Sequence, residues 1–237
     1  MKILVCIPSK GRSENIQKYT LPFVERLQLD YKIFVEPQEK EKYNFKHVVL
    51  HEKNNIGLGG ALLSCKKYAQ QNNYDVILKI DDDVQGIGDV ENDIDKIKKG
   101  LSINTVSAIC FPYDFEFYAK TNKMFSRLNK RIQTAYFIKT ERFRPNEKVS
   151  TFEDFYQFLQ IINKGETTLY CSKHMIKCKP VGKGDGGLQI FNREDMAKKE
   201  IAIFKSIDPT ISIVFKKDKP WKYEPKFVDK KYKSKAI

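Results

Sequence analysis

The sequence predicts an α/β fold in which a mostly parallel sheet is covered by helices on both faces. Short apolar, β-branched runs alternate with segments of helical pattern, and polar residues directly follow several of these runs. The runs expected to be strands are 2–8, 31–35, 46–50, 76–80, 106–112, 135–139, 167–171 and 211–215. The expected helices are 13–29, with a break at Pro22, and 61–71, 152–163 and 192–204.

Residues that end strands and form loops are easier to recognise in the first half of the sequence. Pro8 ends the first strand and Pro37 closes the second, while three glycines, Gly57, Gly59 and Gly60, come just before helix 61–71. In parallel sheets, ligands bind outside the carboxyl ends of the strands. The glycines favour either close approach to a ligand or tight packing of the helix against its neighbours. The second half is less regular, and the lysine-rich end from 216 onward is expected to be partly extended.

Composition limits the class of protein. The chain has 237 residues, enough for one large α/β domain or two small ones, and a net charge of +13, which attracts polyanions such as nucleic acid. The five cysteines contain no CxxC pair, which disfavours a zinc ribbon and indicates reduced thiols. The apolar run 2–7 is too short for a signal peptide, and no run has the length of a membrane span. We therefore expect a soluble, cytoplasmic protein.

Three successive aspartates mark the candidate centre of the chemistry. Asp81, Asp82 and Asp83 directly follow the apolar run 76–80. Strand side chains alternate, so Asp81 and Asp83 should point to the same side, where two carboxylates repel each other unless a cation lies between them. Mg²⁺ and Mn²⁺ take oxygen ligands and bridge to phosphates. The alternative is a solvated acidic turn at the end of a strand.

Four segments in order resemble the GT-A glycosyltransferases. The run Ile80–Asp83 looks like their DxD motif, and Ile7–Arg12 resembles the donor loop after their first strand. Residues 55–61 resemble the N-x-G-x-x-x-A segment, and Glu153-Asp154 with the helix after it looks like the later ED motif. The resemblance covers about the first two-thirds of the chain. It implies a Rossmann-like GT-A fold with a less regular, acceptor-binding second half.

The resemblance also implies a division of the chain and of its roles. A single catalytic domain is expected over 1–215, with a nucleotide-sugar half at 1–112 and an acceptor half at 113–215, followed by a basic tail at 216–237. A UDP-sugar donor and Mn²⁺ or Mg²⁺ are the expected cofactors. The residues expected to bind the donor are Pro8, Ser9, Arg12, Glu36, Asn55, Gly57, Asp81, Asp82 and Lys183. Asp83 and Asp81 are the expected metal ligands, and His174 is a possible third ligand.

Residues 150–154 fit two descriptions. In an inverting transferase a carboxylate takes the proton of the acceptor hydroxyl, and Asp154, with Glu153 beside it, fits that place in the family pattern. The run Ser150–Glu153 also has the form of a capping box, in which acidic residues simply favour a first helical turn. Lys183 belongs to the glycine-rich run 182–187, which is either a loop that closes over the diphosphate or a plain hairpin.

The charge pattern indicates the acceptor. Basic residues crowd the segment 120–144 with aromatic residues between them, and lysines recur in the tail. Basic side chains contact phosphates and aromatic rings stack on exposed bases, although a solvated lysine face over an ordinary core has the same composition. A small enzyme with this charge is similar to phage glycosyltransferases, including those associated with TET/JBP-type oxygenases, that modify hydroxymethylated pyrimidines. The resemblance implies double-stranded DNA as acceptor, with the modified base flipped into the site, in a host cytoplasm if phage-encoded.

Three other functions fit parts of the sequence. A transferase acting on a surface glycan would keep the chemistry and change the acceptor. A sugar nucleotidyltransferase would share the general fold, but residues 8–12 have too few glycines for its signature. A nucleic-acid-binding protein without activity gives no reason for three aspartates in a cleft, because they repel phosphate unless a metal is bound.

Overall fold

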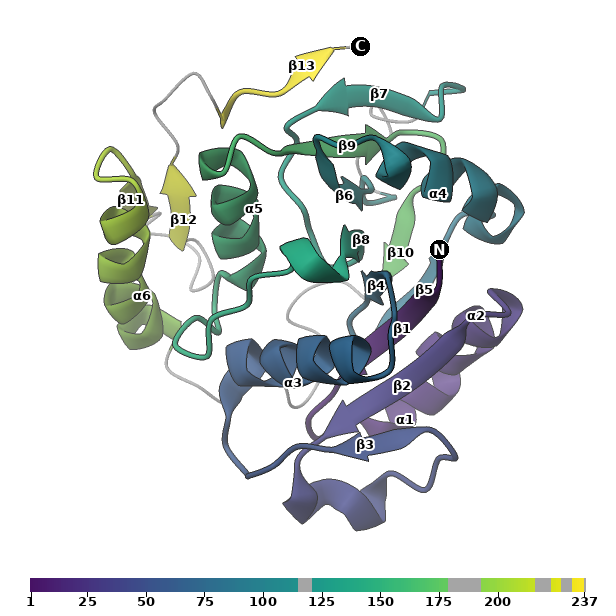
Figure 1. The fold of residues 1–237 in the computed structure, drawn as a ribbon. Coiled ribbons are helices and arrows are strands. Elements are labelled where there is room, and N and C mark those ends of the chain that lie inside the picture. Colours follow the sequence, from purple (N-terminus) through teal and green to yellow (C-terminus); the bar gives the residue numbers. More distant parts are fainter. Residues whose placement is uncertain (115–120, 179–192, 216–222, 227–231, 237) are drawn as a thin grey trace.

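The structure is a computed structural model, and it describes residues 1–114, 121–178, 193–215, 223–226 and 232–236. A nine-stranded sheet lies at its centre, in the order β13-β7-β9-β6-β8-β4-β1-β2-β3 (Figure 1). Its strands are β1 (Ile3–Pro8), β2 (Asp30–Val35), β3 (Val48–Leu50), β4 (Val76–Lys79), β6 (Val106–Cys110), β7 (Phe125–Leu128), β8 (Tyr136–Lys139), β9 (Thr167–Cys171) and β13 (Lys235–Ala236). β7 and β8 run opposite to the other strands, so the predicted mostly parallel sheet is confirmed.

Helices cover both faces of this sheet, as predicted. They are α1 (Ser13–Asn15), α2 (Leu21–Arg26), α3 (Gly57–Gln71), α4 (Ile94–Ser102), α5 (Glu153–Asn163) and α6 (Arg193–Ile207). Residues 16–20 form a π-helical turn that joins α1 to α2, and Pro22 lies in the first turn of α2. The predicted break at Pro22 is therefore a change of helix type.

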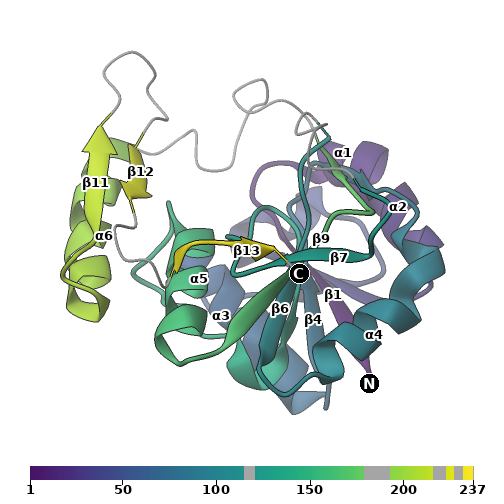
Figure 2. The same cartoon turned by 90° about the horizontal axis from the view of Figure 1, so that it is seen from above.

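The alternation of strand side chains divides the core into two layers. On β1, Leu4 and Cys6 face one cluster, which includes apolar side chains of α3 and α5, while Val5 and Ile7 face the other, which includes those of α2 and α4. Figure 2 shows α3, α5 and α6 on one side of the strands and α1, α2 and α4 on the other. The sheet is therefore buried on both faces, and this packing holds the ends of its strands in fixed positions relative to one another.

Two short antiparallel pairs lie beside the main sheet. β5 (Val84–Ile87) follows the three aspartates and pairs with β10 (Ile176–Cys178), so that Cys178 lies opposite Val84. β11 (Ser212–Phe215) pairs with β12 (Tyr223–Lys226), which belongs to the predicted tail. The tail also supplies β13, which adds to the edge of the main sheet beside β7. The sequence did not predict β5, α4, β7, β10, β12 or β13.

Candidate active site

The carboxyl ends of four neighbouring parallel strands meet at one edge of the sheet. Ser9 follows β1, Glu36 follows β2, His51 follows β3 and the aspartates follow β4. The backbone binds these ends together, because the N–H of Ser9 donates to the carbonyl of Phe34 at 3.0 Å. The sheet thus brings Pro8, Ser9, Glu36 and the aspartates to one edge, as the sequence predicts.

Asp82 binds the loop after β1 rather than facing solvent. It is 5% exposed, its Oδ2 accepts a hydrogen bond from Ser9 Oγ at 2.6 Å, and its Oδ1 lies 3.1 Å from Arg12 Nη1. The hydroxyl of Tyr43 lies 2.8 Å from Ser9 Oγ and accepts from the Arg12 N–H. Burial raises the pKa of Asp82, and Arg12 opposes that rise. These bonds hold the loop after β1 against the aspartate turn.

Asp81 and Asp83 flank this buried anchor. The N–H of Val84 bonds to the carbonyl of Asp81, so the three aspartates form a tight turn between β4 and β5. Burial and the like charges of Asp81 and Asp82 raise the pKa of Asp83 to about 6. No other described residue donates a hydrogen bond to the Asp83 carboxylate. A carboxylate crowded by like charges in this way is stabilised by a bound cation.

Glu36 lies in a polar cluster formed by two loops. Its carboxylate pairs with Lys10 Nζ at 2.9 Å and accepts from Gln38 Nε2 at 2.8 Å. Lys10 also donates to Asn55 Oδ1 at 3.2 Å. The structure thus brings Glu36 and Asn55 together at Lys10 of the loop after β1, in an arrangement that offers both hydrogen-bond donors and acceptors.

Lys79 is a site residue that the sequence analysis missed. It is the last residue of β4 and is fully buried, yet its ammonium lies 2.5 Å from Asp81 Oδ1 and 3.6 Å from Glu153 Oε1. It also donates to the carbonyl of Thr134 at 3.3 Å. Burial alone would lower the pKa of Lys79, but Asp81 and Glu153 raise it above the ordinary value, so the amine is charged.

The first turn of α5 brings Glu153 and Asp154 to the same region. Burial raises the pKa of Glu153, and Lys79 opposes the rise. Burial likewise raises the pKa of Asp154, opposed by Arg131, whose Nε lies 3.8 Å from Asp154 Oδ2. The guanidinium of Arg131 also lies over the ring of Phe155, 4.0 Å from its centre, which fixes its orientation. Sequence reasoning placed Arg131 only in a general basic run.

The predicted capping box at the start of α5 is wrong. Phe152 is the N-cap and no side-chain cap bond is present at that end. Glu200 of α6 replaces it, because its buried carboxylate accepts hydrogen bonds from the N–H groups of Ser150, Thr151 and Phe152 at 2.7, 2.8 and 3.1 Å. A distant carboxylate therefore accepts from the three backbone N–H groups that lead into α5, and Glu153 pairs with Lys79 instead.

The glycines before the predicted helix belong to α3 itself and serve close packing. A Cβ on Gly59 would lie 2.1 and 2.3 Å from two backbone carbonyl oxygens of the loop 146–149. Gly57 has a φ of +66°, and a Cβ there would lie 2.5 Å from Ser150 Oγ. Of the two predicted interpretations, the structure supports tight packing, because α3 lies directly against the segment that leads into α5.

His174 lies away from the aspartate turn. Cys178 of β10 faces Val84, next to Asp83, whereas His174 lies beyond the other end of this strand pair. Its Nε2 lies 2.9 Å from Asp93 Oδ2, and burial lowers its pKa. His174 therefore serves a buried polar cluster. Lys183 and the rest of the glycine-rich run 182–187 lie outside the described residues.

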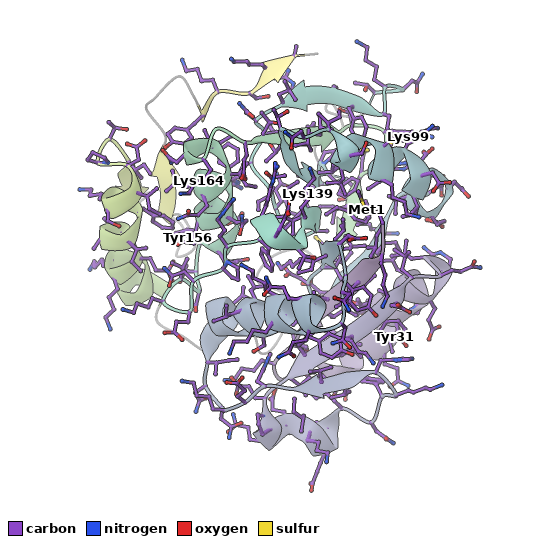
Figure 3. The ribbon with its side chains drawn as sticks, viewed as in Figure 1. Met1, Tyr31, Lys99, Lys139, Tyr156 and Lys164 are labelled. Atoms are coloured by element: carbon purple, nitrogen blue, oxygen red, sulfur yellow. The ribbon has the colours of Figure 1, made fainter. Side chains whose placement is uncertain are left out.

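In the basic segment 120–144, some of the basic side chains are exposed, while several of the aromatic side chains between them are buried. Arg127 on β7 is exposed, and the exposed Lys235 of β13 pairs in register with Leu128 beside it. In contrast, Tyr136, Phe137 and Phe143 are fully buried. These three aromatic residues belong to the core and do not stack on bases. Exposed lysines such as Lys99 and Lys164 also occur elsewhere on the surface (Figure 3).

Comparison with known proteins shows the fold. No family model and no curated protein matches the sequence. Glucosyl-3-phosphoglycerate synthase from Mycobacterium tuberculosis, in complex with Mg²⁺ and UDP, superposes with a TM-score of 0.56 at 11% identity, covering 95% of this chain and 86% of that chain. TarS 1–349 from S. aureus, in complex with UDP-GlcNAc, gives a TM-score of 0.54 at 14% identity, covering 87% of this chain and 66% of that chain.

These likenesses confirm the predicted GT-A fold, and at such identities they show the fold alone. Within the described residues, no group of three or more His, Cys, Asp and Glu side chains is arranged to hold a metal ion. No described helix has both the length and the apolarity needed to cross a bilayer.

Proposed function

We propose that this protein is a metal-dependent glycosyltransferase that moves a sugar from a UDP-sugar to a hydroxyl acceptor. The observation that carries the proposal is the aspartate turn at the tip of β4, beside the loop after β1, in a GT-A fold. Two solved structures with this fold contain UDP or UDP-GlcNAc, one of them with Mg²⁺. The three carboxylates of the aspartate turn add a chemical reason for this function to the likeness of fold.

The residues of the turn fit a divalent cation. Asp81 and Asp83 offer the oxygen ligands that Mg²⁺ and Mn²⁺ prefer, and the raised pKa of Asp83 reflects a negative site that a cation would relieve. Since the described residues provide no group of three such ligands, diphosphate oxygens and water would have to supply the remaining ones. The bound ion would supply charge stabilisation for the leaving diphosphate.

The wider charge balance agrees with one divalent ion. Five carboxylates surround the candidate site, those of residues 81–83, Glu153 and Asp154, and three cations pair with them: Arg12, Lys79 and Arg131. When all are ionised, two negative charges remain. A single divalent cation would offset these charges.

The protein groups have distinct roles in this proposal. Ser9, Asp82 and Arg12 hold the donor loop in place, and Glu36 with Asn55 provides polar contacts for the nucleoside. Asp154 is the base that accepts the proton of the acceptor hydroxyl, because burial raises its pKa and so increases its basicity. Both carboxylates have a cationic partner, and Glu153 is the less suitable base because its side chain is the less exposed, at 13% against 21% for Asp154.

For the acceptor, the proposal is a hydroxymethylated pyrimidine in double-stranded DNA. The support is the basic edge, which we define as Lys123, Arg127, Lys130, Arg131, Lys233 and Lys235. The pairing of β13 with β7 brings the two lysines of the tail close to this part of the chain (Figure 1). Arg131 contacts Asp154, so the basic edge leads to the proposed base. Basic side chains so arranged suit a phosphate backbone.

The experiment is transfer from a panel of UDP-sugars, with Mn²⁺, to duplex DNA with or without hydroxymethylcytosine, followed by mass spectrometry of the nucleosides. A sugar adduct on the modified base only, and none with Asp83→Asn, is expected. Donor turnover with a glycan acceptor but no DNA adduct would exclude DNA while keeping sugar transfer. No binding or turnover of any UDP-sugar would exclude the transferase itself.

A further inference from the structure

Lys79 joins the two halves of the candidate site. It lies on β4 two residues before Asp81, and side chains at such spacing on a strand point to the same face. Its ammonium contacts Asp81 from the aspartate turn, the Thr134 carbonyl from the segment before β8, and Glu153 from the start of α5. These three partners come from three separate parts of the chain.

The burial of the charged Lys79 side chain indicates that its partners require a cation at this position. A charged amine removed from water is strongly disfavoured, and it is kept only where partners satisfy it. Lys79 is 0% exposed, and the ring of Tyr136 covers it at 5.8 Å from the ring centre. The rest of β4 is apolar and buried, so Lys79 is the one charged residue of this strand.

The position of Lys79 also controls repulsion between carboxylates. Asp81, Glu153 and Asp154 come from two separate segments and carry like charges that would push the start of α5 away from the aspartate turn. A cation between Asp81 and Glu153 reverses the sign of that force. Glu200 binds the backbone just before Glu153, so α5 is held at its start by a cation on one side and a carboxylate on the other.

We propose that Lys79 is a positioning residue that sets the relative placement of Asp81 and the α5 carboxylates, and so aligns the donor with the base. The inference rests on the proposed function. Lys79 does not touch substrate in this account. Its loss should therefore leave donor binding largely intact, because Asp83 and the donor loop remain, while turnover falls.

The test compares Lys79→Met with wild type and with Lys98→Met, a control that loses a surface ion pair to Asp95 at 3.6 Å. Calorimetry gives the Kd for UDP with Mn²⁺, and transfer assays give kcat and KM for the donor. We expect a Kd within about threefold of wild type and a kcat at least about 100-fold lower for Lys79→Met, with Lys98→Met unchanged on both counts. Lys79→Arg, which restores the charge, should recover at least about tenfold of the lost kcat.

The outcomes separate this inference from the proposed function. A wild-type protein that neither binds UDP with Mn²⁺ nor turns over a donor overturns both. If the wild type is active and the kcat of Lys79→Met lies within threefold of the wild-type kcat, the positioning role alone is overturned. An equal loss of UDP affinity and of kcat also overturns it, because that is the result expected of a merely structural role. If Lys79→Met does not fold, Lys79→Gln keeps a hydrogen-bond donor without the charge, and the same limits apply to it.

Discussion

The pKa of Asp83 predicts a steep pH dependence of metal binding. Burial and the neighbouring carboxylates raise this pKa to about 6, and metal binding requires the deprotonated form. Lowering the pH through about 6 therefore protonates Asp83 and weakens binding. At about pH 5 only about a tenth of a group with this pKa is ionised, whereas an ordinary aspartate remains almost fully ionised. We expect the affinity for Mn²⁺ to fall about tenfold between about pH 7.5 and about pH 5.

The assay is electron paramagnetic resonance of free Mn²⁺, titrated with protein and without nucleotide, so that phosphate titration does not contribute. Asp83→Asn is the matched control, because it removes the titrating group while keeping its size; its residual affinity should be weak and should vary much less over this range. An affinity for wild type that stays constant down to about pH 5 would refute the reasoning, since it would mean that Asp83 does not bind the ion or that its pKa is ordinary.

Three further predictions concern packing and the base. Gly59→Ala should lower the free energy of unfolding by about 2 kcal/mol or more in urea titrations, because its Cβ would meet two carbonyl oxygens, whereas Gly86→Ala, with 4.0 Å of space, should cost much less. Glu200→Ala should cost about 1–3 kcal/mol in the same titrations by leaving backbone donors unbonded; an unchanged midpoint would contradict the capping role. Arg131→Met should raise the pKa of Asp154, which would appear as a shift of the acidic limb of kcat/KM to higher pH, and an unshifted limb would exclude Asp154 as the base.

The early strands and the edge they form were predictable because the local pattern agrees with the tertiary structure. Run 76–80 is apolar and strand-like, and it is also a central strand between β1 and β8, so pattern and packing point the same way. The polar residues that follow β1, β2 and β4 meet at one edge because parallel strands share a direction. This rule of topology needs no knowledge of side-chain contacts.

The parts that sequence reasoning missed depend on contacts between distant residues. Glu200 lies 48 to 50 positions from the N–H groups it binds, so the local pattern at 150–153 offered a capping box as one alternative and gave no sign of the distant carboxylate. Lys79 had a visible signal, a single charge inside an apolar strand, but only the fold shows that Glu153 lies next to it. His174 lacked any signal that Asp93 would bind it.

The most direct measurement is a crystal structure with UDP and Mn²⁺, using anomalous diffraction at the manganese edge to locate the ion. The account predicts one anomalous peak at the tip of β4, within about 2.3 Å of a carboxylate oxygen of Asp83 and of an oxygen of the diphosphate. Bound UDP with its diphosphate remote from residues 81–83, or manganese held elsewhere, would contradict it.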